Sequence, residues 1–216
     1  MTRLALTRTT ATAALAVMTT ACAATQPVRV LPKGQSRIIA SVGGPWQPKK
    51  SPTVVVPYAT LGMMRGLSDR TTLVYDAHVL MAAFGVAGAD VGLAHRVRAQ
   101  RGALPEITGL GQAYLFAGSG GTRLFPHASV NASWMHGERQ LFYLGGDAFG
   151  QFTGGPAVLF APLAGWQFPV HRRVQLQTEL KWMAANVNTD RGIFKGQGNI
   201  GGHGGLSFQL GVQVGR

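Results

Sequence analysis

His127 and Ser129 are the two side chains whose types and spacing point most directly to chemistry. In a β-strand, residues two positions apart share a face. The imidazole could then take the proton of the serine hydroxyl if an acidic residue oriented the ring. Glu138 and Asp147 are the candidate acids. A motif of two residues also arises by chance, so the competing interpretation is a polar pair with no catalytic role.

Longer motifs of other reaction classes are absent from the sequence. It has no phosphate-binding Gly-x-x-x-x-Gly-Lys-Ser/Thr loop, no paired cysteines and no His-Glu-x-x-His. The segment 201–205 contains His203 among four glycines, and one histidine without neighbouring co-ligands predicts a flexible loop rather than a metal site. We therefore expect no metal and no cofactor other than the lipid discussed next.

Cys22 is the only cysteine of the chain, and it follows a leader with the parts of an export signal. The leader has two arginines, then an uncharged stretch rich in Ala, Thr and Leu, then small residues. Thr19-Thr20-Ala21-Cys22 resembles the lipobox of bacterial lipoproteins, which implies an acylated Cys22, although that family prefers leucine where this chain has Thr19. An ordinary cleaved signal with an incidental cysteine is the other interpretation. We expect a signal peptide over 1–21, a lipidated tether over 22–35 and one domain over 36–216.

The composition is that of neither a typical soluble domain nor a helical membrane protein. Only 13% of the 216 residues are charged, against roughly a quarter in soluble domains. No apolar run approaches the ~20 residues that a membrane helix needs. An outer-membrane β-barrel satisfies both conditions, because its lipid-facing residues alternate with polar ones along each strand.

Alternation is clearest over residues 173–186. Val174, Leu176, Leu180 and Trp182 fall on one face, and Gln175, Gln177, Glu179 and Lys181 fall on the other. Similar or weaker patterns predict ten strands, over 36–44, 53–65, 71–83, 88–98, 106–117, 124–135, 140–152, 156–168, 173–186 and 206–214. Pro57, Pro126 and Pro162 lie within these strands, where we expect bulges or strand ends. One merged or missed pair of strands would make the count eight or twelve.

The connections between these strands fall into two classes. Those after the second, fourth, sixth and eighth strands are fairly short and basic, whereas the alternate ones are rich in glycine and include the longest, 187–202. A lipidated N-terminus would begin in the periplasm, so the basic turns would be periplasmic and the glycine-rich loops would face outward. Trp134, Phe142, Trp166 and Phe168 all lie close to a basic turn, as expected of an aromatic girdle at the membrane interface.

The faces predicted to point inward collect ionisable side chains. They are Asp76, His78, Asp90, Arg96, His127, Asp147, Glu179 and Lys181. An isolated buried charge costs several kcal/mol, so these groups must be paired or hydrated. Because a ten-strand barrel is close to the size that side chains can fill, a lumen plugged by ion pairs is favoured over an open conduit or a small-molecule site.

Two family resemblances bear on these expectations. One hairpin is similar to those of small Gram-negative outer-membrane β-barrel proteins: it runs from Tyr58 through Gly62 to Gly66-Leu67-Ser68-Asp69-Arg70, and a second alternating strand follows. More narrowly, the chain resembles outer-membrane barrel lipoproteins. Such barrels often end in an aromatic residue, whereas this sequence ends Val214-Gly215-Arg216. The His-x-Ser core at His127 and Ser129 is also found in outer-membrane lipid A deacylases, and nothing around it matches.

The sequence therefore predicts an all-β fold, a single antiparallel up-and-down barrel, anchored by lipid in the outer membrane. Its expected role is structural or interactive rather than enzymatic. One alternative is a soluble periplasmic barrel, tethered by its lipid, with the apolar faces inside around a small apolar ligand. The other is a lipid-modifying esterase that uses His127 and Ser129. The basic excess, +10 after removal of the leader, favours membrane lipids, lipopolysaccharide or cell-wall polymer over nucleic acid as partners.

Overall fold

The chain forms a closed antiparallel barrel of ten strands. The computed structural model describes residues 25–45, 58–137, 140–152, 157–188 and 199–215. The strands are β1 (Ser36–Pro45), β2 (Tyr58–Ser68), β3 (Thr71–Ala77), β4 (Ala87–Arg98), β5 (Glu106–Gly118), β6 (Gly121–His136), β7 (Gln140–Gln151), β8 (Ala157–His171), β9 (Val174–Asn188) and β10 (His203–Gly215). Each strand pairs with its neighbours in sequence, and β1 pairs with β10 to close the barrel. The predicted fold class and strand number are confirmed.

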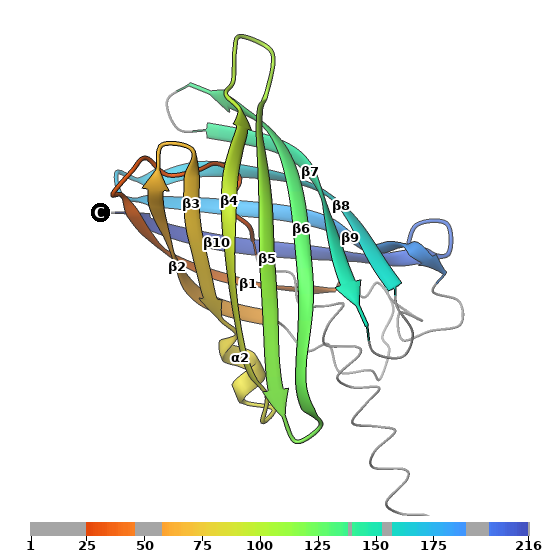
Figure 1. The fold of residues 1–216 in the computed structure, drawn as a ribbon. Helices are drawn as coiled ribbons and strands as arrows, with labels where there is room; N and C mark the ends of the chain where they lie inside the picture. Colours follow the sequence, from red (N-terminus) through yellow and green to blue (C-terminus); the bar gives the residue numbers. More distant parts are fainter. Residues whose placement is uncertain (1–24, 46–57, 138–139, 153–156, 189–198, 216) are drawn as a thin grey trace, which may run out of the picture.

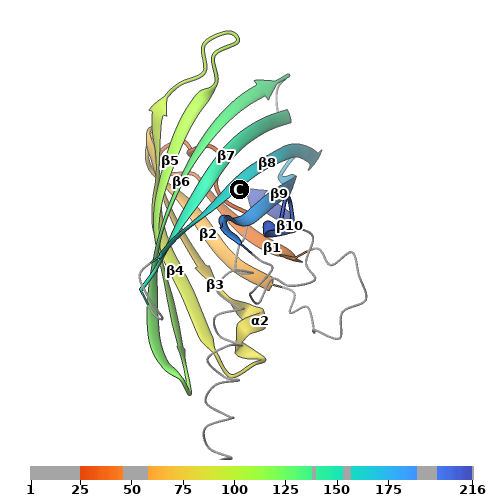
Figure 2. The ribbon, with the colours of Figure 1, turned by 90° about the vertical axis from the view of Figure 1, so that its right-hand side faces the viewer.

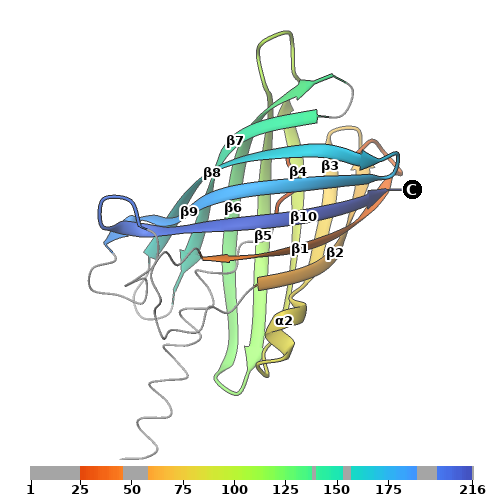
Figure 3. The same cartoon turned by 180° about the vertical axis from the view of Figure 1, so that it is seen from behind.

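The strands are strongly inclined to the barrel axis. In Figure 1, β4 to β6 run steeply in front while β8 to β10 cross behind them, and Figure 3 shows the same crossing from the back. We call the end that carries the β2–β3, β4–β5, β6–β7 and β8–β9 connections the turn end, and the opposite end the loop end. Gly215, the last described residue, and the start of β1 both lie at the turn end, as an even strand count requires.

The apolar faces of the strands point outward. Leu180 and Phe208 are about half exposed, whereas their neighbours Glu179 and Gln209 are buried. On the described strands β5 to β10, the outward-facing positions carry no Lys, Arg, Asp or Glu. The soluble alternative required Leu180 and Phe208 inside the barrel, so its premise does not hold.

One predicted strand was too long. The alternation over 71–83 continues through Val79 and Met81, but β3 ends at Ala77 and is followed by the short helix α2 (Val79–Ala82). Met81 turns inward and packs in a cluster that contains Tyr58, Tyr114 and Phe116. Figure 2 shows α2 at the loop end, whereas the β4–β5 connection lies at the other end of the barrel. Among the described residues, no helix is long and apolar enough to cross a membrane.

Pro126 and Pro162 mark ends of hydrogen-bonded ladders without causing bulges. Pro126 pairs with Ala113 on β5 and lies one residue beyond the β6–β7 ladder, which stops at His127. Pro162 pairs with Gly146 and lies one residue before the β8–β9 ladder. Register shifts occur instead at 66–68, 96–98, 169–171 and 203–205. Pro57 and most of the predicted longest loop fall outside the described residues.

A row of aromatic side chains crosses the outer surface near the turn end. Phe142 is the register partner of both Trp134 and Trp166. The Phe142 and Trp166 rings stack with centroids 5.4 Å apart, and Trp166 contacts Phe168 at 4.6 Å. The indole N–H of Trp134 donates to the carbonyl oxygen of Ala103. All four residues predicted to form a girdle are therefore neighbours at one end of the barrel.

Candidate functional site

The lumen contains a chain of polar side chains between two apolar regions. Toward the loop end it holds the aromatic cluster around Tyr114, Phe116 and Phe125. Toward the turn end it holds an aliphatic cluster that includes Ile39, Met64 and Leu110. Most of the ionisable residues predicted to face inward lie between these two clusters.

Lys181 is the centre of the first polar group. Its Nζ lies 2.9 Å from Asp147 Oδ2 and 3.0 Å from Glu179 Oε1, and all three side chains are at most 1% exposed. β9 places Glu179 and Lys181 on one face because they are two residues apart. Tyr143 on β7 adds a hydroxyl that donates to Glu179 and accepts from the Gln177 amide. The ion pairs thus have hydrogen-bonding neighbours, as fully buried charges require.

A second group forms around His78, between β3 and α2. Its Nε2 lies 2.8 Å from Asp90 Oδ2, and both side chains are buried. Asp76 is the register partner of Asp90 across β3 and β4. Gln112 on β5 joins the two groups, because its amide donates to Asp90 and its carbonyl oxygen lies 3.3 Å from His127 Nδ1.

His127 connects this path to the lysine group. Its Nε2 is 3.7 Å from Asp147 Oδ1, and its ring stacks on Phe149 at 4.3 Å. The structure therefore brings together seven of the eight predicted residues. Arg96 stands apart, half-buried at the turn end, where it repels the guanidinium of Arg29.

The arrangement around Ser129 does not resemble an activated serine. Its hydroxyl accepts the Asn131 amide at 3.3 Å, and both nitrogens of His127 have other neighbours, Gln112 and Gln26. Ser129 and His127 are 2% and 4% exposed, so the described residues around them cover both side chains. The candidate acid Asp147 is engaged with Lys181, and Glu138 lies outside the described residues.

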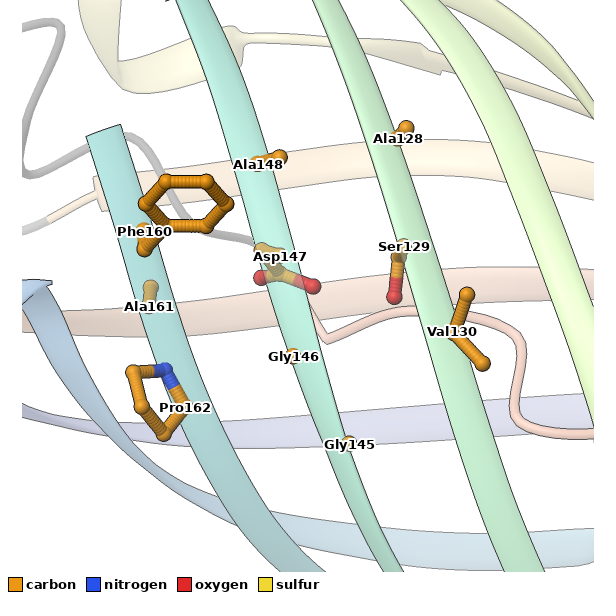
Figure 4. Close-up of a pocket in the computed structure, with 10 residues that line it drawn as sticks. All are labelled: Ala128, Ser129, Val130, Gly145, Gly146, Asp147, Ala148, Phe160, Ala161 and Pro162. Atoms are coloured by element: carbon orange, nitrogen blue, oxygen red, sulfur yellow. The ribbon is translucent and has the colours of Figure 1, made fainter. Parts of the chain in front are cut away.

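Behind this part of the wall, the outer surface has a shallow hollow of about 320 Å³ (Figure 4). Small residues form its floor, namely Ala128, Gly146 and Ala148, and Phe160 and Pro162 border it on β8. Ser129 and Asp147 contribute to its lining, but their side chains are buried. The hollow therefore opens toward the surroundings of the barrel and does not expose the polar group.

The sequence missed several members of the site. The side-chain nitrogen of Gln26 lies 3.1 Å from His127 Nε2, and the backbone carbonyl oxygen of Gln26 accepts a hydrogen bond from the Gln177 amide. Gln26 nevertheless belongs to the segment predicted to be a tether. Arg29 of the same segment bonds to Ser133 and lies 3.9 Å from Glu106. A polar residue in a short proline-containing segment gives no periodic signal, so only long-range contacts reveal it. The described residues contain no group of three His, Cys, Asp or Glu side chains placed to hold a metal ion.

Comparisons with known proteins concern the fold. No protein-family model matches the chain, and no curated protein matches it. Among solved structures, the translocator domain of the autotransporter NalP from Neisseria meningitidis is 12% identical with a TM-score of 0.48, covering 83% of this chain and 88% of that one. The outer membrane protein OprG from Pseudomonas aeruginosa is 10% identical with a TM-score of 0.37, covering 88% and 99%. The attachment invasion locus protein Ail of Yersinia pestis is 10% identical with a TM-score of 0.28, covering 85% and 99%.

Proposed function

We propose that this protein is an integral outer-membrane barrel with a plugged lumen, anchored additionally by lipid on Cys22, and that it serves a structural or interaction role in the envelope. The outward apolar surface is the observation that carries the proposal. Large side chains such as Val130, Leu144 and Phe160 are more than half exposed on neighbouring strands. In water, apolar surface of this extent would drive aggregation, whereas hydrocarbon solvates it.

The dimensions of the strands support the same environment. A membrane-spanning strand needs about 9–11 residues at a tilt near 45°. Nine of the ten strands have at least ten residues. The aromatic row around Phe142 and Trp166 fits the headgroup region, where a ring can be apolar on one side and hydrogen-bonded on the other.

Burial of the side chains that face inward supports the plugged lumen. Lys181, Gln177 and Gln209 are 0% exposed, so neighbouring protein groups surround them completely. A conduit for solutes would leave such groups hydrated. An enzymatic role has no comparable support, because His127 and Ser129 are enclosed by the same packing.

Detergent dependence tests the membrane proposal. The Cys22→Ser chain, which cannot carry the lipid, should remain soluble after refolding only with detergent or lipid. It should also migrate faster on an electrophoresis gel when unheated than when boiled. A chain that stays monomeric in plain buffer without this heat-dependent shift would refute an integral barrel.

The lipid on Cys22 needs a separate measurement. Mass spectrometry of the mature wild-type chain should show an N-terminal cysteine carrying a diacylglyceryl group, and the Cys22→Ser chain should lack that mass. A mature chain that begins elsewhere, or at an unmodified cysteine, would remove the anchor from the proposal and leave the barrel intact.

A further inference from the structure

A small basic pocket lies in the mouth of the barrel at the turn end. Its volume is about 150 Å³, and it is bordered by the ends of β1, β9 and β10 and by the turn between β8 and β9. Figure 3 shows these ends side by side near the C-terminal label. The polar side chains of the pocket include Arg37 on β1, Arg172 and Arg173 in the β8–β9 turn, Gln175 on β9 and Gln213 on β10.

Strand register brings these residues together although they are distant in sequence. Arg37 is the register partner of Gly215, and the N–H of Gly215 donates to the carbonyl oxygen of Arg173 at 2.9 Å. Gln213 and Gln175 are register partners on β10 and β9. All five positions are an even number of residues from the buried, inward-facing positions of their strands, so the pocket belongs to the lumen side of the wall.

Arg37 is held at this pocket by buried glutamine side chains. Its Nη1 donates to Gln175 Oε1 at 2.6 Å and to Gln213 Oε1 at 3.2 Å. Gln213 is only 3% exposed, and its amide donates to Gln177 at 2.8 Å. Gln167 donates to the same oxygen of Gln213 at 3.4 Å. The guanidinium group of Arg37 is therefore fixed in position before any ligand arrives.

The charge of the pocket is positive. Its lining contains no Asp or Glu, and neither Arg172 nor Arg173 forms an ion pair with a carboxylate of the described residues. The acidic residues described at the turn end lie elsewhere: Asp69 accepts the backbone N–H of Lys33, and Glu106 lies 3.9 Å from Arg29. An anion in the pocket would thus meet three arginines whose charge no lining carboxylate balances.

We propose that this pocket binds a phosphate group through Arg37, Arg172 and Arg173. The planar fork of an arginine donates two parallel hydrogen bonds to a phosphate, and a phosphate has enough oxygen atoms to accept from several such forks at once. A carboxylate has only two oxygen atoms, so it would satisfy fewer of these donors. The volume suits one small anionic group rather than an extended chain.

The phosphate can come from a lipid headgroup or from a soluble compound. The aromatic row reaches the same height on the outer surface, because Phe168 is the register partner of Leu176, which follows Gln175. Headgroups at the level of these rings would lie close to the β8–β9 turn. The site itself does not depend on the membrane proposal, and only the lipid source of the phosphate rests on it.

Titration with inorganic phosphate tests the site. Full-length protein refolded in maltoside detergent, which carries no phosphate, should bind it in calorimetry with an affinity that falls as salt is added. Acetate, the control anion, should bind much more weakly. Arg172→Gln/Arg173→Gln should weaken phosphate binding about tenfold, because it removes two charged donors.

Arg98→Gln/Arg101→Gln is the matched control variant. It removes the same charge from exposed positions at the same end of the barrel, outside the pocket. It should weaken phosphate binding by less than about twofold, since distant surface charges are screened. The heat-dependent gel shift identifies folded protein in both variants. Equal weakening in the two variants would show attraction to the general surface charge and would overturn the site.

Native mass spectrometry with added phosphatidylglycerol, and with phosphatidylcholine as the zwitterionic control, identifies the source. Phosphatidylglycerol adducts that Arg172→Gln/Arg173→Gln loses and the control variant keeps would assign the pocket to a lipid headgroup. Adducts that are equal in all variants, together with selective loss of inorganic phosphate binding, would assign it to a soluble phosphate.

The possible failures are separable. A detergent-dependent barrel in which neither ligand distinguishes the pocket variant from the control variant would overturn the site and retain the membrane proposal. Selective phosphate binding by a chain that stays monomeric in plain buffer would refute the membrane proposal and retain the site.

Discussion

Replacing Lys181 by methionine should strongly destabilise the barrel. Among the described residues, the Lys181 ammonium lies within 3.0 Å of both Asp147 and Glu179, and His127 lies 3.7 Å from Asp147. Methionine keeps the length and apolar character of the stem. The substitution therefore removes charge and hydrogen bonds while changing the packing little.

The expected cost follows from what is left behind. Without Lys181, two carboxylates remain buried beside one another, and breaking a buried ion pair in this way costs about 3–5 kcal/mol. In Asp147→Asn, by contrast, Lys181 keeps Glu179 at 3.0 Å, so we expect a loss of only about 1–3 kcal/mol. The triple variant Lys181→Met/Asp147→Asn/Glu179→Gln leaves no buried charge in the group and should recover most of the loss.

Unfolding by guanidinium of barrels refolded in detergent micelles measures these differences, with the heat-dependent gel shift as the marker of folded protein. Lys33→Met is the control, because Lys33 is exposed at the turn end, and it should change stability by less than about 0.5 kcal/mol.

The order of the variants decides the outcome. A Lys181→Met barrel as stable as wild type would mean that the lumen is hydrated and the charges are screened. A larger loss in Asp147→Asn than in Lys181→Met would mean that charge balance does not govern the group.

Three other predictions address the wall of the barrel and the enzymatic alternative. Gly165→Ala should lower the free energy of unfolding by about 1–3 kcal/mol, because the new methyl group would collide with the Tyr143 ring. Gly146→Ala is its control, because a methyl group there would enter open space. Equal losses of unfolding free energy in the two variants would contradict this reason. Val130→Arg, at an outward position in the middle of β6, should lower the free energy of unfolding in lipid by about 2–4 kcal/mol. Val158→Arg, near one end of β8, should lower it by at most about 1 kcal/mol. Equal and negligible losses in the two variants would argue against a lipid-facing surface. Purified wild-type protein should hydrolyse neither p-nitrophenyl esters nor lipid A acyl chains, and any hydrolysis that Ser129→Ala abolishes would restore the esterase hypothesis.

The positions of the strands, and which face of each strand points outward, were predictable because they depend on a local signal, the alternation of apolar and polar residues. Along β9 and β10, large apolar residues alternate with Gln, Glu, Lys and Ser, and the barrel turns every apolar set outward. The same signal failed at Val79 and Met81, since Val79–Ala82 is a run of four apolar residues, too short for periodicity to distinguish a helix from a strand. Bulges such as the one near Gly66 were also missed, because they depend on how the neighbouring strand is registered.

The composition of the polar group was only partly predictable. Alternation identified Glu179 and Lys181 as inward-facing, and burial then requires that they be paired. Which carboxylate would complete the pair was not determined by sequence, since Asp147 lies 34 positions from Lys181. The contribution of Gln26 was inaccessible to sequence reasoning for the same reason, because its partners His127 and Gln177 are 101 and 151 residues away.

The central claim is that the apolar face of every strand contacts lipid. A spin-label scan of single cysteines along β10, from position 206 to 214, in reconstituted bilayers tests it most directly. Oxygen should collide more often than a water-soluble nickel complex at positions 206, 208, 210, 212 and 214, and the label at Ser207 should collide rarely with either. Preferential collision of the nickel complex at Phe208 and Leu210 would place that face in water and contradict the claim.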